Sequence, residues 1–507
     1  MNMYDHLLSL AIWVPIAAGV LVLATGGDQR AGLARILAFI GSLAGFLVTI
    51  PLFTGFDRLH GGYQFVEKLA WIPSLNIHYA LGVDGISVLF VILNAFITLM
   101  VVLAGWQVIQ KRVAQYMGAF LMMSGLINGA FSAQDAILFY VFFEGMLIPL
   151  YLIIGVWGGP RRVYASIKLF LYTLLGSLLM LVALIYLSTQ ADGSFAITDL
   201  QRIAKIDLPV QQWLFVAFFL SFAVKVPMWP VHTWLPDAHV EAPTGGSMVL
   251  AAITLKVGAY GFLRFILPIL PDAARFFAPV VVVVSLIAVI YIGMVALVQT
   301  DMKKLVAYSS ISHMGFVTLG IFMFSGIFSG SPLGELNRWG LEGAIVQMIS
   351  HGFVSAAMFM CIGVMYDRLH TRNIADYGGV VNVMPKFAAF MMLFGMANAG
   401  LPATSGFVGE FMVIMGAVQV NFWVGALAAL TLIYGAAYTL WMYKRTIFGD
   451  ITNPEVREMK DINCREFAIL AILAVAVLGM GLWPQPFIEV VHQAANDLIA
   501  QVAQSKI

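Results

Sequence analysis

Charged residues are scarce in this sequence: Asp, Glu, Lys and Arg make up 10% of its 507 residues, whereas hydrophobic residues make up 61%. A soluble domain carries about 25% charged and about 45–50% apolar residues. The composition therefore excludes an ordinary soluble protein and predicts one that crosses a membrane many times. Because the apolar runs are long and continuous, we expect an all-α polytopic membrane protein and not a barrel.

Cysteine and net charge are also low. The two cysteines, Cys361 and Cys464, have neither metal-ligand spacing nor the pattern of a disulfide framework. The formal net charge is +1, so nothing in the charge balance indicates a nucleic-acid partner. The sequence has no nucleotide-binding glycine motif, no Cys-x-x-Cys and no His-Glu-x-x-His. We therefore expect no cofactor and no metal in this chain, and expect its driving reaction to occur elsewhere.

Apolar runs of about 18 or more residues predict about fourteen transmembrane helices. The predicted spans are 6–25, 33–54, 85–106, 116–133, 135–156, 165–188, 212–235, 247–269, 277–299, 303–328, 342–365, 386–417, 421–446 and 466–483. The stretch 57–84 is too polar to span, and 485–507 has the periodicity of an amphipathic helix, so we expect both at the surface.

Lys and Arg in the loops predict the orientation. Loops after odd-numbered spans carry about twice as many of these residues as the other loops and the C-terminus together. The more basic side is expected to be cytoplasmic, which predicts that both termini are periplasmic.

A faint internal repeat is present. Three pairs of unusual residues recur at similar intervals: Glu144 and His313, Lys168 and His351, and Pro227 and Pro402. A unit of five helices fits these intervals, and an odd number of spans inverts the second copy. We therefore predict two inverted five-helix repeats with helices broken at the two prolines. The predicted divisions are 1–115 (three N-terminal helices), 116–270 and 271–447 (the two repeats), and 448–507 (last helix and C-terminal interfacial segment).

Four ionisable residues lie inside predicted spans: Glu144, Lys225, Lys256 and Glu410. One such residue at the membrane centre costs roughly 2.5–3.5 kcal/mol, and four cost roughly 10–14 kcal/mol. That cost is comparable to the whole stability of a typical protein, about 5–15 kcal/mol. We infer that the four residues carry the function.

Prolines accompany two of these charges. Pro227 follows Lys225 by two residues, and Pro402 precedes Glu410 by eight. A proline inside a helix frees a backbone carbonyl, which water or polar groups must then satisfy. A helix break beside a buried charge is typical of an ion path, whereas a lone proline often only bends a helix.

The four residues suggest different roles. Glu144 and Lys225 favour each other's charged form, so a change at one affects the other and the pair is a candidate proton switch. The alternative is a static buried salt bridge, although such pairs stabilise weakly. Lys256 has no acidic partner in its span and is the candidate mid-membrane proton carrier. Glu410 is the candidate terminal acceptor, exchanging with water beyond the second break.

Further titratable residues are weaker candidates. Lys168, His313 and His351 are candidates to bridge the sites above, although a buried histidine is often simply hydrogen-bonded. The segment with His232, Asp237 and His239 is either a metal cluster or a loop for proton access; its prolines and interfacial position favour the loop.

Two segments resemble a known family. They are Phe222–His239 (FAVKVPMWPVHTWLPDAH), continued by Glu241–Ser247 (EAPTGGS), and Thr300–Phe316 (TDMKKLVAYSSISHMGF). Both are similar to the antiporter-like membrane subunits of proton-pumping NADH-quinone oxidoreductase, respiratory complex I. The segment Gly400–Phe411 (GLPATSGFVGEF) resembles the chain M branch, the mitochondrial subunit-four type, because related subunits usually have Lys where this sequence has Glu410.

The resemblance implies a fourteen-helix fold with one proton channel coupled to distant quinone reduction. It implies that Glu144, Lys225, Lys256 and Glu410 occupy the functional positions. NADH, FMN, iron–sulfur clusters and quinone are expected in other subunits. The expected partners are neighbours of the chain L and chain N type, the lipid membrane and, indirectly, the peripheral redox arm. The expected location is the bacterial inner (plasma) membrane.

Two alternatives remain open. The first is a subunit of a multisubunit cation/proton antiporter; Glu410 and the lack of further carboxylates for Na⁺ argue against it. The second is a structural membrane-arm scaffold with no transport role.

Overall fold

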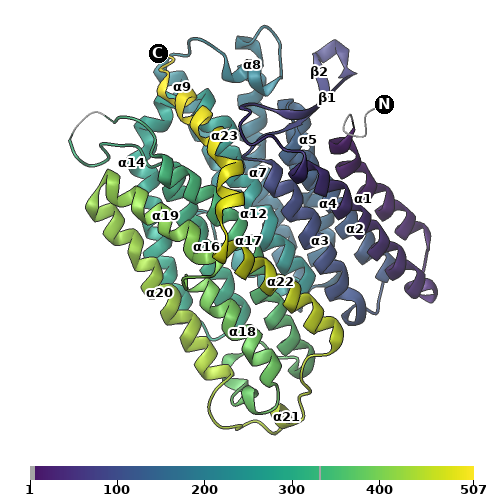
Figure 1. Cartoon of the computed structure of the whole chain (residues 1–507). Helices are drawn as coiled ribbons and strands as arrows, with labels where there is room; N and C mark the ends of the chain where they lie inside the picture. Colours follow the sequence, from purple (N-terminus) through teal and green to yellow (C-terminus); the bar gives the residue numbers. More distant parts are fainter. Residues whose placement is uncertain (1–5, 331–332) are drawn as a thin grey trace.

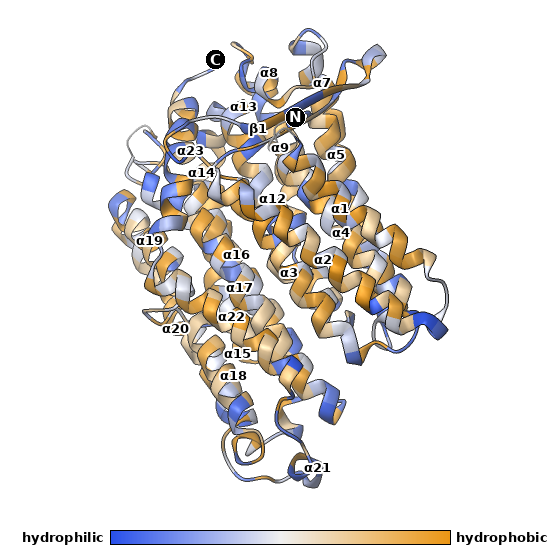
Figure 2. Ribbon diagram, turned by 45° about the vertical axis from the view of Figure 1, so that its right-hand side comes forward, coloured by the Kyte–Doolittle hydropathy of each residue, from blue (hydrophilic) through white to orange (hydrophobic). Residues whose placement is uncertain are grey.

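The fold is a long bundle of helices with a small β-hairpin at one end (Figure 1). The computed structural model describes residues 6–330 and 333–507. Hydrophobic residues cover the helices along the length of the bundle, and hydrophilic residues gather at its two ends (Figure 2). This distribution fits a protein whose middle lies in lipid.

The chain begins with α1 (Leu7–Ala24) and α2 (Ala31–Thr54), followed by β1 (Gln64–Ile72), β2 (Ile77–Val83) and α3 (Val88–Val108). The polar stretch predicted at the surface is the antiparallel hairpin β1–β2, which turns at Asn76 in the left-handed region (φ 53°). The hairpin lies at one end of the bundle, so its predicted surface position is confirmed (Figure 1). The strands themselves were not predicted.

The elements of the first half are α4 (Val113–Ser132), α5 (Ala136–Gly145), α6 (Leu147–Trp157), α7 (Arg162–Gln190), α8 (Ile197–Gln201), α9 (Leu208–Lys225), α10 (Trp234–Glu241), α11 (Thr244–Val249), α12 (Leu255–Gly261) and α13 (Leu267–Ile269). Those of the second half are α14 (Pro271–Ile287), α15 (Gly293–Leu297), α16 (Met302–Ile321), α17 (Arg338–Leu369), α18 (Pro385–Asn398), α19 (Ser405–Val420) and α20 (Phe422–Thr446). The chain ends with α21 (Pro454–Arg457), α22 (Cys464–Leu482) and α23 (Gln485–Ala503).

Within the described residues, 11 helices are long and apolar enough to cross a membrane. The other predicted spans correspond to α4, α16 and the pair α18–α19. Two of the 11, Thr244–Ile269 and α17, are buried throughout their most apolar windows, so they form the centre of the bundle. The C-terminal helix predicted at the surface is α23, whose face with Val491, Ala494 and Leu498 is buried.

The two halves contain equivalent helix starts at opposite ends of the bundle. Asp135 caps α5 and bridges to Ala196 near α8, and Asp301 caps α16 and bridges to Asn373. The end with α8 also carries the hairpin, whereas the segment after Asn373 contacts the cap of α21 at the other end (Figure 1). This is the relation that inverted repeats require. The predicted limits at 270/271 and 447/448 fall between helices, but 115/116 falls inside α4; the division itself stays a prediction.

Both predicted helix breaks are present. The chain leaves helical form between Lys225 and Trp234, and again between Asn398 and Ser405. At the first break, the N–H of Met228 donates to the Ala223 carbonyl that Pro227 frees (2.7 Å). The Trp234 indole donates to the Val224 carbonyl (2.8 Å). Protein groups therefore satisfy these freed carbonyls.

Close helix crossings hold the first helices together. A Cβ on Gly125 of α4 would overlap the backbone carbonyl oxygen of Ile12 in α1, whereas a Cβ on Gly479 of α22 would have no neighbour within 4 Å. Backbone cannot move aside as a flexible side chain can, so α1 and α4 must separate to admit a methyl group at position 125.

Gly125→Ala is expected to lower the free energy of unfolding by about 1–3 kcal/mol, the usual cost of overpacking. The measurement is the thermal unfolding of the purified protein in detergent. Gly479→Ala is the matched helical control and is expected to be neutral or slightly stabilising, since Ala is the better helix former. Equal unfolding temperatures for the two variants would contradict this account of the α1–α4 crossing.

Candidate functional site

The candidate site begins where the two most buried helical segments meet. Lys256, on α12, and His351, on α17, are both buried, and Lys256 Nζ lies 2.7 Å from His351 Nδ1. Nζ also donates to the Ala251 carbonyl. Ala251 belongs to a π-helical turn, Leu250–Thr254, whose wider backbone turns its carbonyls off the usual helical register.

Two further contacts extend the site into the second half. The His351 and His313 rings have centroids 5.6 Å apart. His313 Nδ1 lies 3.1 Å from Glu410 Oε1. Lys256, His351, His313 and Glu410 therefore form one group of neighbouring buried side chains from α12, α17, α16 and α19, which we call the axial cluster.

Polar side chains and an open backbone position surround Glu410. The Gln347 amide donates to Glu410 Oε1 (3.3 Å). Gly400, in the second break, has φ +78°, and a Cβ there would overlap Glu410 Oε2. The carboxylate thus lies in space that the absence of a side chain at residue 400 leaves open. On the other side, Tyr438 Oη lies 3.5 Å from His313 Nε2.

Glu144 and Lys225 are neighbours but not a direct pair. Both residues are described, and their charged atoms are not within ion-pair distance. Lys225 Nζ instead lies 5.2 Å from the centroid of the Phe143 ring, a cation–π arrangement. Glu144 is half-buried beside Ser177, and its Oε1 has no hydrogen-bond partner among the described atoms. The static salt bridge that the sequence left as the alternative is therefore not formed between these two described residues, and the Phe143 ring lies beside the ammonium; the proton switch stays a prediction.

Aromatic rings pack near the contact between the helices that carry Lys225 and Lys256. The helices that carry them approach closely, since a Cβ on Gly258 would lie 3.0 Å from Lys225 Cβ. The rings of Phe143, Phe222 and Phe262 pack together in this region.

The remaining candidates lie nearer to the first break. Lys168 Nζ forms an ion pair with Asp237 Oδ2 (2.7 Å) and donates to the Thr233 carbonyl (3.1 Å). His239 is fully buried and stacks on Phe359 (centroids 4.5 Å), and neither ring nitrogen has a hydrogen-bond partner among the described atoms. His232 is also buried. Residues 6–330 and 333–507 contain no group of three His, Cys, Asp or Glu that could hold a metal ion.

The expected loop is present only in part: His232 lies in the non-helical first break, whereas Asp237 and His239 lie on the buried helix α10 (Trp234–Glu241). Pro236 falls in the first turn of that helix, where a missing N–H breaks no intrahelical hydrogen bond. The proline that suggested a loop is therefore compatible with a helix start.

Comparison with known proteins identifies the family. Residues 133–435 match the family model described as NADH:quinone oxidoreductase/Mrp antiporter, TM. The chain is 47% identical to NADH-quinone oxidoreductase subunit M of Rhodobacter capsulatus, over 98% of this chain and 96% of that one. This chain belongs to the subunit M family of NADH-quinone oxidoreductases.

Two further similarities agree. NADH-ubiquinone oxidoreductase chain 4 of Arabidopsis thaliana is 43% identical, over 97% of both chains. A chain of respiratory complex I from Thermus thermophilus with bound NADH has the same fold, with a TM-score of 0.88, 30% identity, and coverage of 98% of this chain and 100% of that one. The resemblance to the chain M branch is confirmed.

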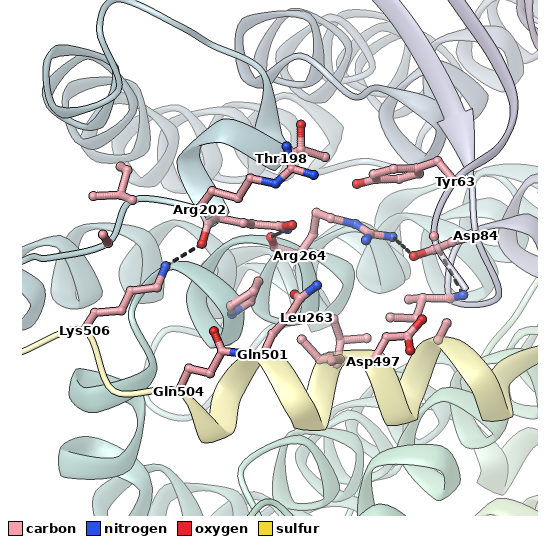
Figure 3. A pocket seen from close by; sticks show the side chains of 18 of the residues that line it. Tyr63, Asp84, Thr198, Arg202, Leu263, Arg264, Asp497, Gln501, Gln504 and Lys506 are labelled. Carbon is pink, nitrogen blue, oxygen red and sulfur yellow. Dashed lines mark hydrogen bonds and ion pairs between the residues drawn. The ribbon is translucent and has the colours of Figure 1, made fainter. Parts of the chain in front are cut away.

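A cavity of about 680 Å³ lies at the end of the bundle that carries α8 and the C-terminus (Figure 3). Arg264 Nη2 and Asp84 Oδ2 form a buried ion pair in it (2.8 Å), and Lys506 Nζ donates to the Gln201 carbonyl (2.7 Å). None of the predicted proton-transfer residues lines this cavity. Its described contacts tie the C-terminal segment to the bundle.

Sequence reasoning missed Gln347 and Tyr438. Gln347 precedes His351 by four residues in α17, so the two lie on the same face of that helix. A polar residue one turn from a candidate histidine in an apolar helix is the signal that was available. Tyr438 gives no comparable signal, since its contact with His313 depends on how α20 packs.

Gly400→Ala is expected to displace Glu410 from His313 and to destabilise the protein by roughly 1–2 kcal/mol, because Ala disfavours the left-handed region. The checks are a structure of the variant, for the Glu410 Oε1–His313 Nδ1 distance, and its unfolding temperature. Gly395→Ala, in α18, is the control, since its Cβ would meet only the Thr439 methyl group at 3.1 Å. An unchanged 3.1 Å contact in Gly400→Ala would contradict the proposed role of Gly400.

Proposed function

We propose that this chain is a membrane-arm subunit of NADH-quinone oxidoreductase that moves protons across the membrane, driven by electron transfer from NADH to quinone in other subunits. The axial cluster carries the proposal. It joins an amine, two imidazoles and a carboxylate in the buried centre of the chain. Each of these groups lowers the stability of a membrane protein when charged, so their presence indicates a function. Membership of the subunit M family supports the coupling to the redox reaction.

The axial cluster offers a path for proton transfer. Lys256 donates a proton to His351 Nδ1 across the 2.7 Å contact, and the paired histidine rings carry it to His313. His313 then protonates Glu410 Oε1 at 3.1 Å. Imidazole suits this task because each ring can accept a proton at one nitrogen and donate at the other.

Glu144 and Lys225 act on this path through their charge. No described hydrogen bond joins either residue to Lys256, whose Nζ contacts Ala251 and His351, so the pair changes the proton affinity of Lys256 by electrostatics. Lys168, Asp237, His232 and His239 lie around the first break and are the proposed groups for proton access to the first half.

The antiporter alternative fits the axial cluster less well. A hard cation such as Na⁺ is held by several oxygen ligands, as Ca²⁺ and Mg²⁺ are. The axial cluster offers one carboxylate and nitrogen donors, which suit a proton. If the chain were only a scaffold, the loss of stability that four ionisable groups inside the membrane cause would have no functional explanation.

The same proposal assigns the cofactors, the partner subunits and the location. NADH, FMN, iron–sulfur clusters and quinone belong to other subunits, and no cofactor is assigned to this chain. Chains of the L and N type are its membrane neighbours, and the redox arm acts on it indirectly. We assign it to the bacterial inner membrane with both termini periplasmic. The start of α1 contacts β1 through Glu67, and Lys506 contacts Ile206, which supports one side for both ends.

Lys225→Ala is expected to lower NADH-driven proton pumping by about tenfold or more, the usual loss when a positioned proton-transfer group is removed. Coupled quinone reduction falls with it, and the complex stays assembled. The measurement is vesicle acidification and NADH oxidation in the same membranes. Lys225→Arg keeps the charge but cannot release its proton, so it separates a switching role from a purely electrostatic one.

Lys205→Ala, at an exposed lysine before α9, is the control and leaves both activities unchanged. Unchanged pumping by an assembled Lys225→Ala complex would defeat the proposal. Failure of assembly alone would favour the scaffold, and sodium-dependent transport would favour the antiporter.

His351→Phe removes the side chain that links Lys256 to His313 but keeps an aromatic ring of similar size. Pumping is expected to fall by about tenfold or more, and the unfolding temperature is expected to fall as well, because Lys256 Nζ loses its imidazole acceptor. His60→Phe, on an exposed turn, is the control. Full pumping in His351→Phe would remove the axial cluster from the proton path.

A further inference from the structure

A buried carboxylate and an exposed imidazole meet at one end of the second half. Glu342 Oε1, in the first turns of α17, lies 2.7 Å from His492 Nδ1 on α23. The side chain of Glu342 is 7% exposed, whereas that of His492 is 46% exposed. The pair thus connects the interior of the bundle with solvent through two groups that both bind protons.

The same helix connects this pair with the axial cluster. Gln347, five residues after Glu342 on α17, donates to Glu410 Oε1 at 3.3 Å. Five residues correspond to a rise of about 7.5 Å. Gln347 and Glu410 therefore lie deeper in the bundle than Glu342, although the Glu342 and Gln347 side chains leave α17 about 140° apart.

An open cavity of about 430 Å³ lies beside this sequence of groups. Glu342 lines it together with Ala403, from the second helix break, and Val408 and Met412, which flank Glu410 along α19. The cavity is large enough for several water molecules, which occupy about 30 Å³ each in the liquid. Its charged lining residues are Arg338 and Glu342, and the other lining residues are mostly apolar, so water is expected at the Glu342 side of the cavity.

Few other charges face the pair. Arg338, on α17 itself, is the cation nearest to Glu342. From α19 the ionisable group is Glu410, and on α22 the charged residues Arg465 and Glu466 lie at the opposite end, beside Arg368. On α23, Glu489 is held by Arg58 (2.7 Å). His492 is thus the only described proton acceptor in hydrogen-bond contact with Glu342.

We propose that Glu342 and His492 form the outer proton-exchange site of the second half, linked to the second helix break, and so to Glu410, through the cavity that Glu342 and Ala403 line. This inference rests on the proposed function and names its outlet. A proton that reaches Glu342 crosses to His492 Nδ1, and the exposed imidazolium releases it to water. One proton moves and no other bond changes. Imidazole changes its charge near neutral pH, so this exchange depends on external pH.

The competing explanation is that the pair only ties α23 to α17. A neighbouring contact tests this, since the Arg58–Glu489 ion pair ties the same helix one turn earlier. That pair is more exposed on its carboxylate side and has no described contact with Gln347 or Glu410. Glu489→Gln therefore weakens the attachment of α23 without touching the route.

The experiment uses the complete complex in inverted membrane vesicles and measures NADH-driven proton pumping per NADH oxidised, as a function of the pH inside the vesicles. Glu342→Gln and His492→Gln are expected to lower this ratio by about tenfold and to flatten its pH dependence. Glu342→Asp restores part of the ratio, because it keeps the acid. Glu489→Gln keeps the parental ratio and pH profile.

A parental pH profile in both Glu342→Gln and His492→Gln overturns the outlet, and so do equal losses in these variants and Glu489→Gln. If Glu342→Gln fails to assemble, His492→Gln carries the test, since its side chain is half exposed. Glu410→Gln separates the two proposals. If Glu410→Gln loses pumping and Glu342→Gln keeps parental pumping, only the proposed outlet is rejected. Parental pumping in Glu410→Gln and Lys225→Ala rejects the proposed function itself.

Discussion

The contact between Lys256 and His351 is the interaction on which the rest of the site depends. It joins the interrupted helix of the first half to the long central helix of the second, both wholly buried. An ammonium in such a place costs several kcal/mol unless other groups share its charge. The π-helical turn before Lys256 supplies the Ala251 carbonyl, and the imidazole supplies the second acceptor. The irregular helix is therefore part of how the lysine is tolerated.

The two helix breaks serve a related purpose without exposing backbone to lipid. At the first, Met228 and Trp234 satisfy the carbonyls of Ala223 and Val224, so the break is a rigid feature and not a local unfolding. At the second, the backbone of Gly400 leaves room for the Glu410 carboxylate. A proline lies at each break: Pro227 follows Lys225 by two residues, and Pro402 precedes Glu410 by eight. The breaks thus position Lys225 at the end of α9 and Glu410 in the second turn of α19, where their side chains reach neighbours from other segments.

The sequence predicted those parts of the site that a local feature of the sequence reveals. A lysine in an apolar run, or a proline beside it, is visible without any structure, and so Lys256, Glu410 and both breaks could be named. No comparable local feature predicted the hairpin β1–β2, the helix α10 or the π-helical turns, because these elements depend on packing between distant segments. The geometry of Glu144 and Lys225 is the clearest case: both residues were found, yet only the three-dimensional packing places the Phe143 ring beside the ammonium.

The aromatic rings beside Lys225 have a functional consequence. A continuous chain of titratable groups across a membrane would let protons flow back down their gradient, so a pump needs an interruption. We infer that the rings of Phe143, Phe222 and Phe262, which pack beside Lys225, provide one. Two unit charges about 10 Å apart still interact by about 1.7 kcal/mol at an effective dielectric constant of about 20, which shifts a proton-binding equilibrium by more than about tenfold. In the proposed mechanism, charge at Lys225 therefore acts on Lys256 through space and not through a direct proton route between them.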